Sequence, residues 1–144
     1  MNTHKNIKQV ADEAIKLAEC LLNNKPNKPG NIECPTKAGV YLIYCGDSRK
    51  KGIIYVGESD NINRRLRGHL SAGESEVTSF RGRLKDAGDL NLKYGPEMKN
   101  WVTKNCEFAL DDDDMYRSRA LRKLVEAILV VFLKDEGEPL LNKS

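Results

Sequence analysis

Two short apolar runs joined by a polar loop constrain the fold of this chain most strongly. The runs are Gly39–Cys45 and Gly52–Gly57, both rich in β-branched and aromatic residues, and Gly46–Lys51 lies between them. Residues of this kind favour extended backbone, and a short polar connection brings consecutive strands together in antiparallel order. We therefore predict a β-hairpin, and the remaining elements must pack around it.

The segments around the hairpin have mainly helical periodicity. An amphipathic helix over Asn6–Asn23 is followed by a proline-containing linker, Lys25–Pro35. After the hairpin we expect helices over Asn61–Leu70 and Phe80–Ala87, a third strand over Trp101–Leu110, and a long helix over Met115–Lys134 opened by the acids Asp111–Asp114. This order predicts an α+β fold with a small three-stranded antiparallel sheet flanked by helices. We expect an N-terminal helix and linker over 1–35 and a catalytic or binding domain over 36–144.

The length and composition exclude several classes of protein. A chain of 144 residues forms one ordinary domain, and no apolar stretch reaches the length of a membrane span. The first residues, Met1–Gln9, lack the pattern of a secretory signal, so a cytoplasmic protein is expected. The cysteines contain no C-x-x-C pair and are expected to be reduced thiols rather than zinc ligands.

Positive charge is concentrated in one part of the sequence. The segment Arg49–Lys85 holds nine basic and four acidic side chains, although the whole chain has a net charge of only +3. Such a stretch suits a polyanion, because neutralising phosphates releases counterions. A solvated basic surface is the equally good alternative. The side chains expected to contact nucleic acid are Arg49, Lys50, Lys51, Arg64, Arg67, Arg81 and Arg83.

The hairpin brings two tyrosines onto neighbouring strands. Tyr41 follows Gly39 by two positions, and Tyr55 precedes Gly57 by two. A phenol is a poor base in water, but a nearby cation or a metal-bound water lowers that barrier. Each tyrosine alone is better explained as strand packing. Glycines weaken strands, so Gly39 and Gly57 suggest a close backbone approach, for example to a ligand.

The following helix carries an arginine and a histidine on one face. Arg65 and His69 are four residues apart, away from the apolar stripe, so we expect both to point away from the core. An arginine there can hold a phosphate oxygen, and a histidine can bond a tyrosine or a water. The alternative is that both are ordinary solvent-exposed side chains without a specific role.

Glu126 interrupts the most apolar stretch of the chain, Leu124–Leu133. A carboxylate in such a setting must be paired, protonated or bound to a cation, because an isolated buried charge is costly. An ion pair with a buried arginine and a Mg²⁺ site shared with a substrate phosphate are about equally good explanations.

Together these residues resemble the GIY-YIG nuclease superfamily. Gly39-Val40-Tyr41 and Tyr55-Val56-Gly57 are similar to the two name-giving motifs, and Gly57–His69 is similar to the stretch that follows them. Glu126 resembles the metal-binding glutamate, and Asn142 the closing asparagine. The resemblance covers about Ala38–Asn142.

The resemblance implies a metal-dependent endonuclease that hydrolyses DNA phosphodiester bonds. Tyr41 would act as general base, helped by Tyr55 or His69, and Arg65 would stabilise the phosphate. Glu126 would bind one Mg²⁺ or Mn²⁺ ion, and Asn142 would orient Glu126 or the tyrosine.

Other functions stay open at this point. The alternatives are a non-cleaving nucleic-acid-binding module on the same scaffold and a protein-interaction domain with a coincidental basic hairpin. An RNA substrate is also open, because nothing in the sequence reads a 2′-hydroxyl. The apolar face of Asn6–Asn23 can pack on its own domain or form a homodimer.

Overall fold

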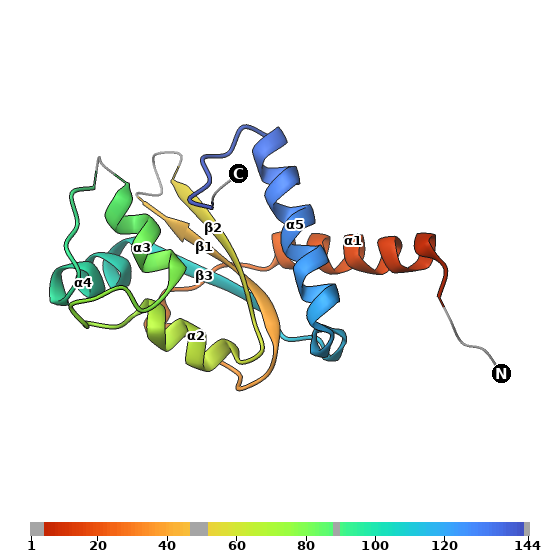
Figure 1. The fold of residues 1–144 in the computed structure, drawn as a ribbon, viewed down its shortest axis with the longest axis horizontal. Helices are drawn as coiled ribbons and strands as arrows, with labels where there is room; N and C mark the ends of the chain where they lie inside the picture. The colour runs from red at the N-terminus through yellow and green to blue at the C-terminus, as the bar shows by residue number, and fades with distance from the viewer. Residues whose placement is uncertain (1–4, 47–51, 88–89, 143–144) are drawn as a thin grey trace.

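The computed structural model describes residues 5–46, 52–87 and 90–142 and has a three-stranded antiparallel sheet at its centre. The hairpin strands are β1 (Gly39–Cys45) and β2 (Ile53–Ser59), and β3 (Cys106–Asp111) pairs with the other side of β1. The strand order is therefore β2-β1-β3 (Figure 1). The α+β class and the antiparallel sheet expected from the sequence are confirmed.

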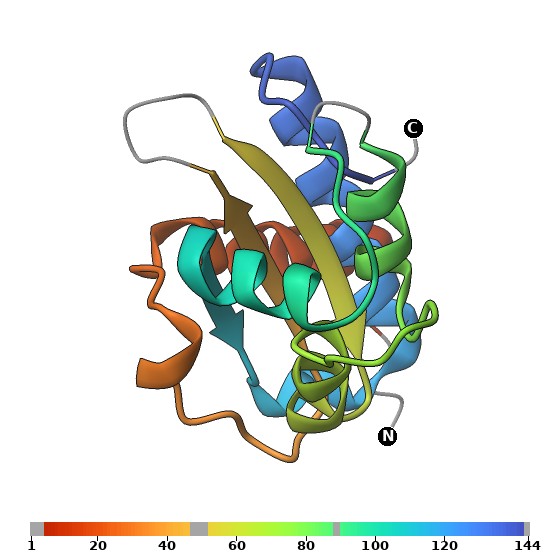
Figure 2. The ribbon, with the colours of Figure 1, turned by 90° about the vertical axis from the view of Figure 1, so that its left-hand side faces the viewer.

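Five α-helices cover the two faces of the sheet within the described residues. They are α1 (Ile7–Asn23), α2 (Ile62–His69), α3 (Ser79–Asp86), α4 (Pro96–Asn105) and α5 (Arg119–Asp135). One apolar cluster joins α1 and α5 to one face, and a second joins α2, α3 and α4 to the other (Figures 1 and 2). The sheet is thus a buried middle layer.

Because side chains alternate between the two faces of each strand, the strands contribute residues to both apolar clusters. Val40 and Leu42 of β1 face α1 and α5, whereas Tyr41 and Ile43 face α2, α3 and α4. Successive strand side chains point to opposite faces, so a strand buried on both faces has a nearly continuous apolar sequence. This explains why the Gly39–Cys45 run lacks polar residues.

Helix α1 is joined to the rest of the chain through the core. Leu17 and Leu21 are buried in the cluster that also contains Val125 and Leu129 of α5. The helix begins with a capping box, in which the Asn6 side chain accepts from the Gln9 amide and the Gln9 side chain accepts from the Asn6 amide. The later part of its apolar face, from Ala14 to Leu21, is therefore covered within its own chain, whereas Ile7 and Val10 in its first turns are exposed.

The third strand begins later than the sequence predicts. Trp101–Leu110 was expected to be a strand, but residues up to Asn105 belong to α4 and β3 starts at Cys106. Pro96 at the first position of α4 favours helix initiation, because its fixed φ suits a helix and no amide hydrogen is lost. Met98 and Val102 are then buried at a helical spacing of four.

The last helix also begins later than expected. The acids over 111–114 do not open it: Asp111 ends β3, and Asp113 caps a short 3₁₀ turn over Asp114–Arg117. The N-cap of α5 is Ser118, whose hydroxyl accepts from the Leu121 amide. The expected first-turn interaction of the acids with the α5 dipole is therefore wrong.

Within the described part of the chain, no helix is long and apolar enough to cross a membrane, and no group of three or more His, Cys, Asp or Glu side chains is placed to hold a metal ion. All of the cysteines are free thiols, with Cys45 and Cys106 buried opposite each other and Cys20 exposed. The expectation of reduced cysteines fits this arrangement.

We predict that α1 stabilises the whole domain. Leu21→Ala should lower the free energy of unfolding by roughly 2–5 kcal/mol, because Leu21 is 0% exposed in the shared core. Ile15→Ala, on the same helix at 44% exposure, should cost less than about 1 kcal/mol. Urea denaturation measures both, and equal losses, or a separate transition for α1, would contradict a shared core.

Candidate active site

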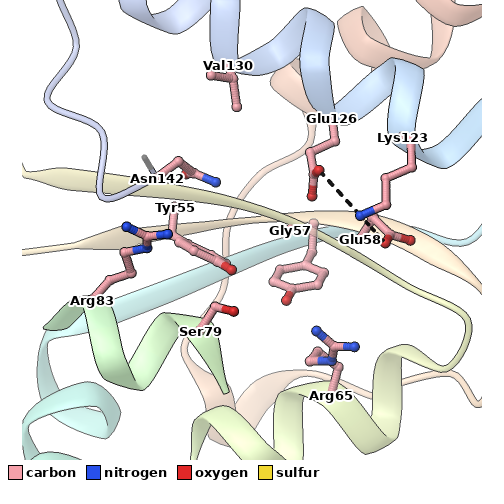
Figure 3. A pocket seen from close by; sticks show the side chains of 11 residues that line it. Tyr55, Gly57, Glu58, Arg65, Ser79, Arg83, Lys123, Glu126, Val130 and Asn142 are labelled. Atoms are coloured by element: carbon pink, nitrogen blue, oxygen red, sulfur yellow. Dashed lines mark ion pairs between the residues drawn. The ribbon is translucent and has the colours of Figure 1, made fainter. Parts of the chain in front are cut away.

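A cavity of about 300 Å³ lies along the outer edge of β2, between α5 and the helices of the opposite face. Its walls come from β1, β2, α2, α3, α5 and the C-terminal segment (Figure 3). The lining residues are Tyr41, Tyr55, Gly57, Glu58, Arg65, Ser79, Arg83, Lys123, Glu126, Val130 and Asn142. Five of the six predicted catalytic residues are among them, and the sixth, His69, contacts Tyr41 directly.

Gly57 makes room for Tyr41 to reach this cavity. The two residues are opposite each other in the hairpin register, and a Cβ on Gly57 would lie 2.4 Å from the Tyr41 hydroxyl oxygen. Gly39 is similarly crowded, with the Asp111 carbonyl oxygen 2.2 Å from where its Cβ would be. Both glycines therefore allow a close approach, but the approaching group is another part of the chain rather than a ligand.

The Tyr41 hydroxyl makes a short hydrogen bond to His69. The phenol oxygen lies 2.6 Å from Nε2 of His69, and both side chains are buried. Burial raises the pKa of Tyr41 well above its ordinary value, and burial together with Arg65 and Arg81 lowers the pKa of His69 to about 3. Both groups are therefore neutral at pH 7.

His69 is not on the outer surface of α2 as expected. It is 1% exposed, because the loop after α2 and the start of α3 cover it, and its other ring nitrogen, Nδ1, lies 2.7 Å from Thr78 Oγ1. The sequence-based separation of His69 from the apolar stripe was wrong, since Phe80 of α3 packs against the ring.

Tyr55 stands beside Tyr41 on the same face of the sheet. Their ring centroids are 6.5 Å apart, and Ser79 at the start of α3 hydrogen-bonds the Tyr55 hydroxyl. Burial, followed by the negative charge of Glu126, raises the pKa of Tyr55. A neutral phenol here can donate a hydrogen bond into the cavity.

Arg65 and Glu126 face the cavity from opposite sides. Figure 3 shows the guanidinium reaching in from α2 and the carboxylate from α5, with Tyr55 to one side of them. The Glu126 side chain is 27% exposed, and its nearest ion pair is a 4.0 Å contact with Lys123. Burial raises the pKa of Glu126, with Lys123 and Arg65 opposing that shift.

The Glu126 carboxylate could serve as the single protein ligand of a Mg²⁺ ion. Its carboxylate opens on the cavity, and the long ion pair with Lys123 leaves a partly buried negative charge weakly compensated. Mg²⁺ usually takes one or two carboxylates and completes its shell with water and substrate phosphate oxygens. The pocket thus suits this ion without a preformed cluster of ligands.

Glu58 is a second carboxylate in the cavity that sequence reasoning missed. Its oxygens pair with Arg122 Nε at 2.8 Å and with Lys123 Nζ at 3.0 Å. Burial alone would raise the pKa of Glu58, but these two cations outweigh it and the pKa is lowered. A charged residue in an otherwise apolar strand was the available signal, and Glu58 ties β2 to α5 beside Glu126.

The side chain of Asn142 hydrogen-bonds the backbone of β2. Its amide oxygen accepts from the Val56 amide and its amide nitrogen donates to the Val56 carbonyl, each at 2.8 Å. The side chain thus pairs with the β2 backbone like a strand residue, between Tyr55 and Gly57. It holds the strand that carries the site, and the expectation that it orients Glu126 or the tyrosine stays a prediction.

The predicted nucleic-acid contacts divide into several groups. Arg83 lines the cavity, and Arg64 and Arg67 are exposed on α2, where Arg64 pairs with Asp60 at 2.6 Å. Arg49, Lys50 and Lys51 lie outside the described residues.

Arg81 does not fit a nucleic-acid surface and corrects that expectation. It is 0% exposed, and its guanidinium donates to the carbonyls of Gly73 and Ser75. Two guanidinium nitrogens, Nη1 and Nη2, are paired with backbone oxygens, whereas the buried Nε has no hydrogen-bond partner, so Arg81 organises the loop between α2 and α3.

Comparison with known families agrees with the architecture of this site. Residues 37–104, slightly less than half of the chain, match the family model described as the GIY-YIG catalytic domain. Such a domain implies a nuclease and therefore a nucleic-acid substrate. No curated protein and no solved structure gave a match.

The GIY-YIG match includes only part of the cavity. Tyr41, Tyr55, Arg65 and His69 lie within residues 37–104, whereas Glu126 and Asn142 lie beyond them. The position of these last two residues at the site is therefore established by the fold alone, through the packing of α5 and the pairing of the C-terminal segment with β2.

We predict that His69 stays neutral down to about pH 4. In the folded protein its pKa is about 3, against an ordinary value near 6.5 in an unfolded chain. The unfolded state therefore binds a proton that the folded state does not. The free energy of unfolding should fall as the pH drops from about 6.5 towards 3.

NMR titration of the imidazole tests this directly. His4 is the other histidine, so a His4→Gln protein has a single imidazole to follow. A titration midpoint near 6.5 in the folded protein would contradict the buried, hydrogen-bonded position of His69.

Proposed function

We propose that the protein is a metal-dependent DNA endonuclease with its catalytic centre in the cavity beside β2. The observation that carries this proposal is the meeting of two phenols, a guanidinium and a weakly paired carboxylate in one open hollow. These groups come from four different elements. Their convergence matches the needs of phosphodiester hydrolysis, which are an activated water, stabilised phosphate charge and a metal ligand.

Tyr41 is proposed as the general base. A neutral phenol can accept a proton from the attacking water only if it gives up its own, and Nε2 of His69 lies 2.6 Å away to receive it. The water oxygen then bonds to phosphorus, the bond to the leaving oxygen breaks, and that oxygen takes a proton from solvent. Tyr55 is placed to hydrogen-bond the water or a phosphate oxygen.

Arg65 and Glu126 are proposed to hold the reacting phosphate between them. The guanidinium can bond phosphate oxygens bidentately and stabilise the charge that develops in the transition state. Glu126 would bind one Mg²⁺ or Mn²⁺ ion, which when bound would act as a Lewis acid on the phosphate and stabilise the leaving oxygen. Arg83 and the exposed Arg64 and Arg67 would contact flanking phosphates.

The test is cleavage of plasmid, branched DNA and RNA by the purified protein, with Mg²⁺, Mn²⁺ or a chelator. We expect metal-dependent cleavage of DNA. Tyr41→Phe should lower the rate by roughly 10²–10⁴, because the general base is lost. Arg65→Ala should lower the rate by a comparable factor, and Glu126→Gln should abolish the metal-dependent cleavage.

The matched control is Arg64→Ala, the neighbour of Arg65 on the exposed side of α2. It should weaken DNA binding modestly and change the maximal rate little. A protein that binds DNA but cuts no substrate with any metal would instead be the non-cleaving module, and cleavage of RNA alone would correct the substrate.

A further inference from the structure

The direction of the hydrogen bond between Tyr41 and His69 depends on the position of one hydrogen. A neutral imidazole has one N–H and one accepting nitrogen, so it exists as one of two tautomers. If Nε2 carries the hydrogen, it donates to Tyr41 and cannot receive the phenol proton. Only the tautomer with hydrogen on Nδ1 leaves Nε2 able to accept it.

The residue that faces Nδ1 is Thr78. Its Oγ1 lies 2.7 Å from Nδ1 of His69 and also accepts a longer, 3.3 Å hydrogen bond from the Arg81 amide as the N-cap of α3. A hydroxyl oxygen has two acceptor lone pairs, so it can receive both hydrogens. Thr78 is half-buried, which leaves its own O–H access to water.

Two neighbours hold Thr78 close to the histidine. Gly68 on α2 has no side chain, and a Cβ there would lie 2.9 Å from the Thr78 methyl carbon. Buried Arg81 donates to the Gly73 and Ser75 carbonyls and so fixes the loop that delivers Thr78. The contact between Thr78 and His69 is therefore built by the packing of α2 against the start of α3.

We propose that Thr78 is a positioning residue that holds His69 as the Nδ1–H tautomer, with Nε2 directed at the Tyr41 hydroxyl. In this arrangement both hydrogen bonds of the imidazole have a donor and an acceptor: Nδ1–H donates to Thr78 Oγ1, and the Tyr41 O–H donates to Nε2. The catalytic meaning of this arrangement rests on the proposed nuclease function, but the tautomer itself is a property of the free protein.

Heteronuclear NMR of the imidazole nitrogens tests the proposal without DNA. In a His4→Gln protein labelled with ¹⁵N-histidine, we expect Nδ1 of His69 to be protonated and Nε2 to be the unprotonated nitrogen. Thr78→Val removes the hydroxyl and should shift the population towards Nε2–H, whereas Thr78→Ser should keep the Nδ1–H form. Gly68→Ala retains the hydroxyl but displaces it, and should shift the population in the same direction as Thr78→Val.

Cleavage kinetics then separate positioning from general destabilisation. Thr78→Val should lower kcat about tenfold with little change in KM, a fraction of the 10²–10⁴ that general-base catalysis contributes. Asn6→Ala, which removes the N-cap of the distant α1, should lose stability without changing the tautomer or kcat.

Either of two NMR results, one in the parent protein and one in the Thr78→Val variant, would overturn the proposal. A predominant Nε2–H tautomer, or a Thr78→Val protein with an unchanged tautomer population, would show that Thr78 only caps α3. The expected tautomer in a protein that cleaves no nucleic acid would leave the positioning role intact and refute the nuclease function.

Discussion

The pairing of Tyr41 with Gly57 across the hairpin is the constraint on which the site depends. Because Gly57 lacks a side chain, the Tyr41 ring lies over the neighbouring strand and its hydroxyl reaches the cavity at the β2 edge. A slip of one residue in this register would send Tyr41 to the face covered by α1 and α5, because strand side chains alternate between faces. The pairing with Gly57 therefore lets Tyr41, a buried strand residue, line the cavity.

The site lies where the two layers of helices meet beyond the edge of the sheet. Tyr41 and Tyr55 belong to one face and Glu126 to the helix on the other, and the absence of a fourth strand beside Gly57 in the described structure lets them share one cavity. Glu58 reinforces this meeting by pairing β2 with Arg122 and Lys123 of α5. Asn142 covers part of the same strand edge through its amide.

The local parts of this arrangement could be predicted from the sequence, and the long-range parts could not. The hairpin and α2 follow from alternation, β-branched residues and a capping side chain, and all lie close together in sequence. The starts of β3 and α5 were misplaced, because Pro96 and Ser118 are stronger helix-start signals than the apolar and acidic runs beside them. Glu126 was recognised as a candidate site residue from its apolar surroundings, since an isolated buried charge is energetically costly unless it is paired or binds a cation.

Burial that depends on loops was the main source of error. His69 and Arg81 are polar side chains on short helices, and their periodicity suggests exposure. The loop between α2 and α3 covers both and supplies hydrogen-bond partners from Thr78, Gly73 and Ser75. Such partners depend on how the loop closes, which no local pattern encodes.

In the proposed nuclease, Glu126 and the two tyrosines share one metal-binding cavity. The most direct measurement is a crystal structure of the protein with Mn²⁺, located by its anomalous scattering. We expect one peak within coordinating distance of a Glu126 oxygen, inside the cavity lined by Tyr41, Tyr55 and Arg65. A peak elsewhere on the molecule, or a Glu126 carboxylate closed by Lys123 at saturating Mn²⁺, would contradict it.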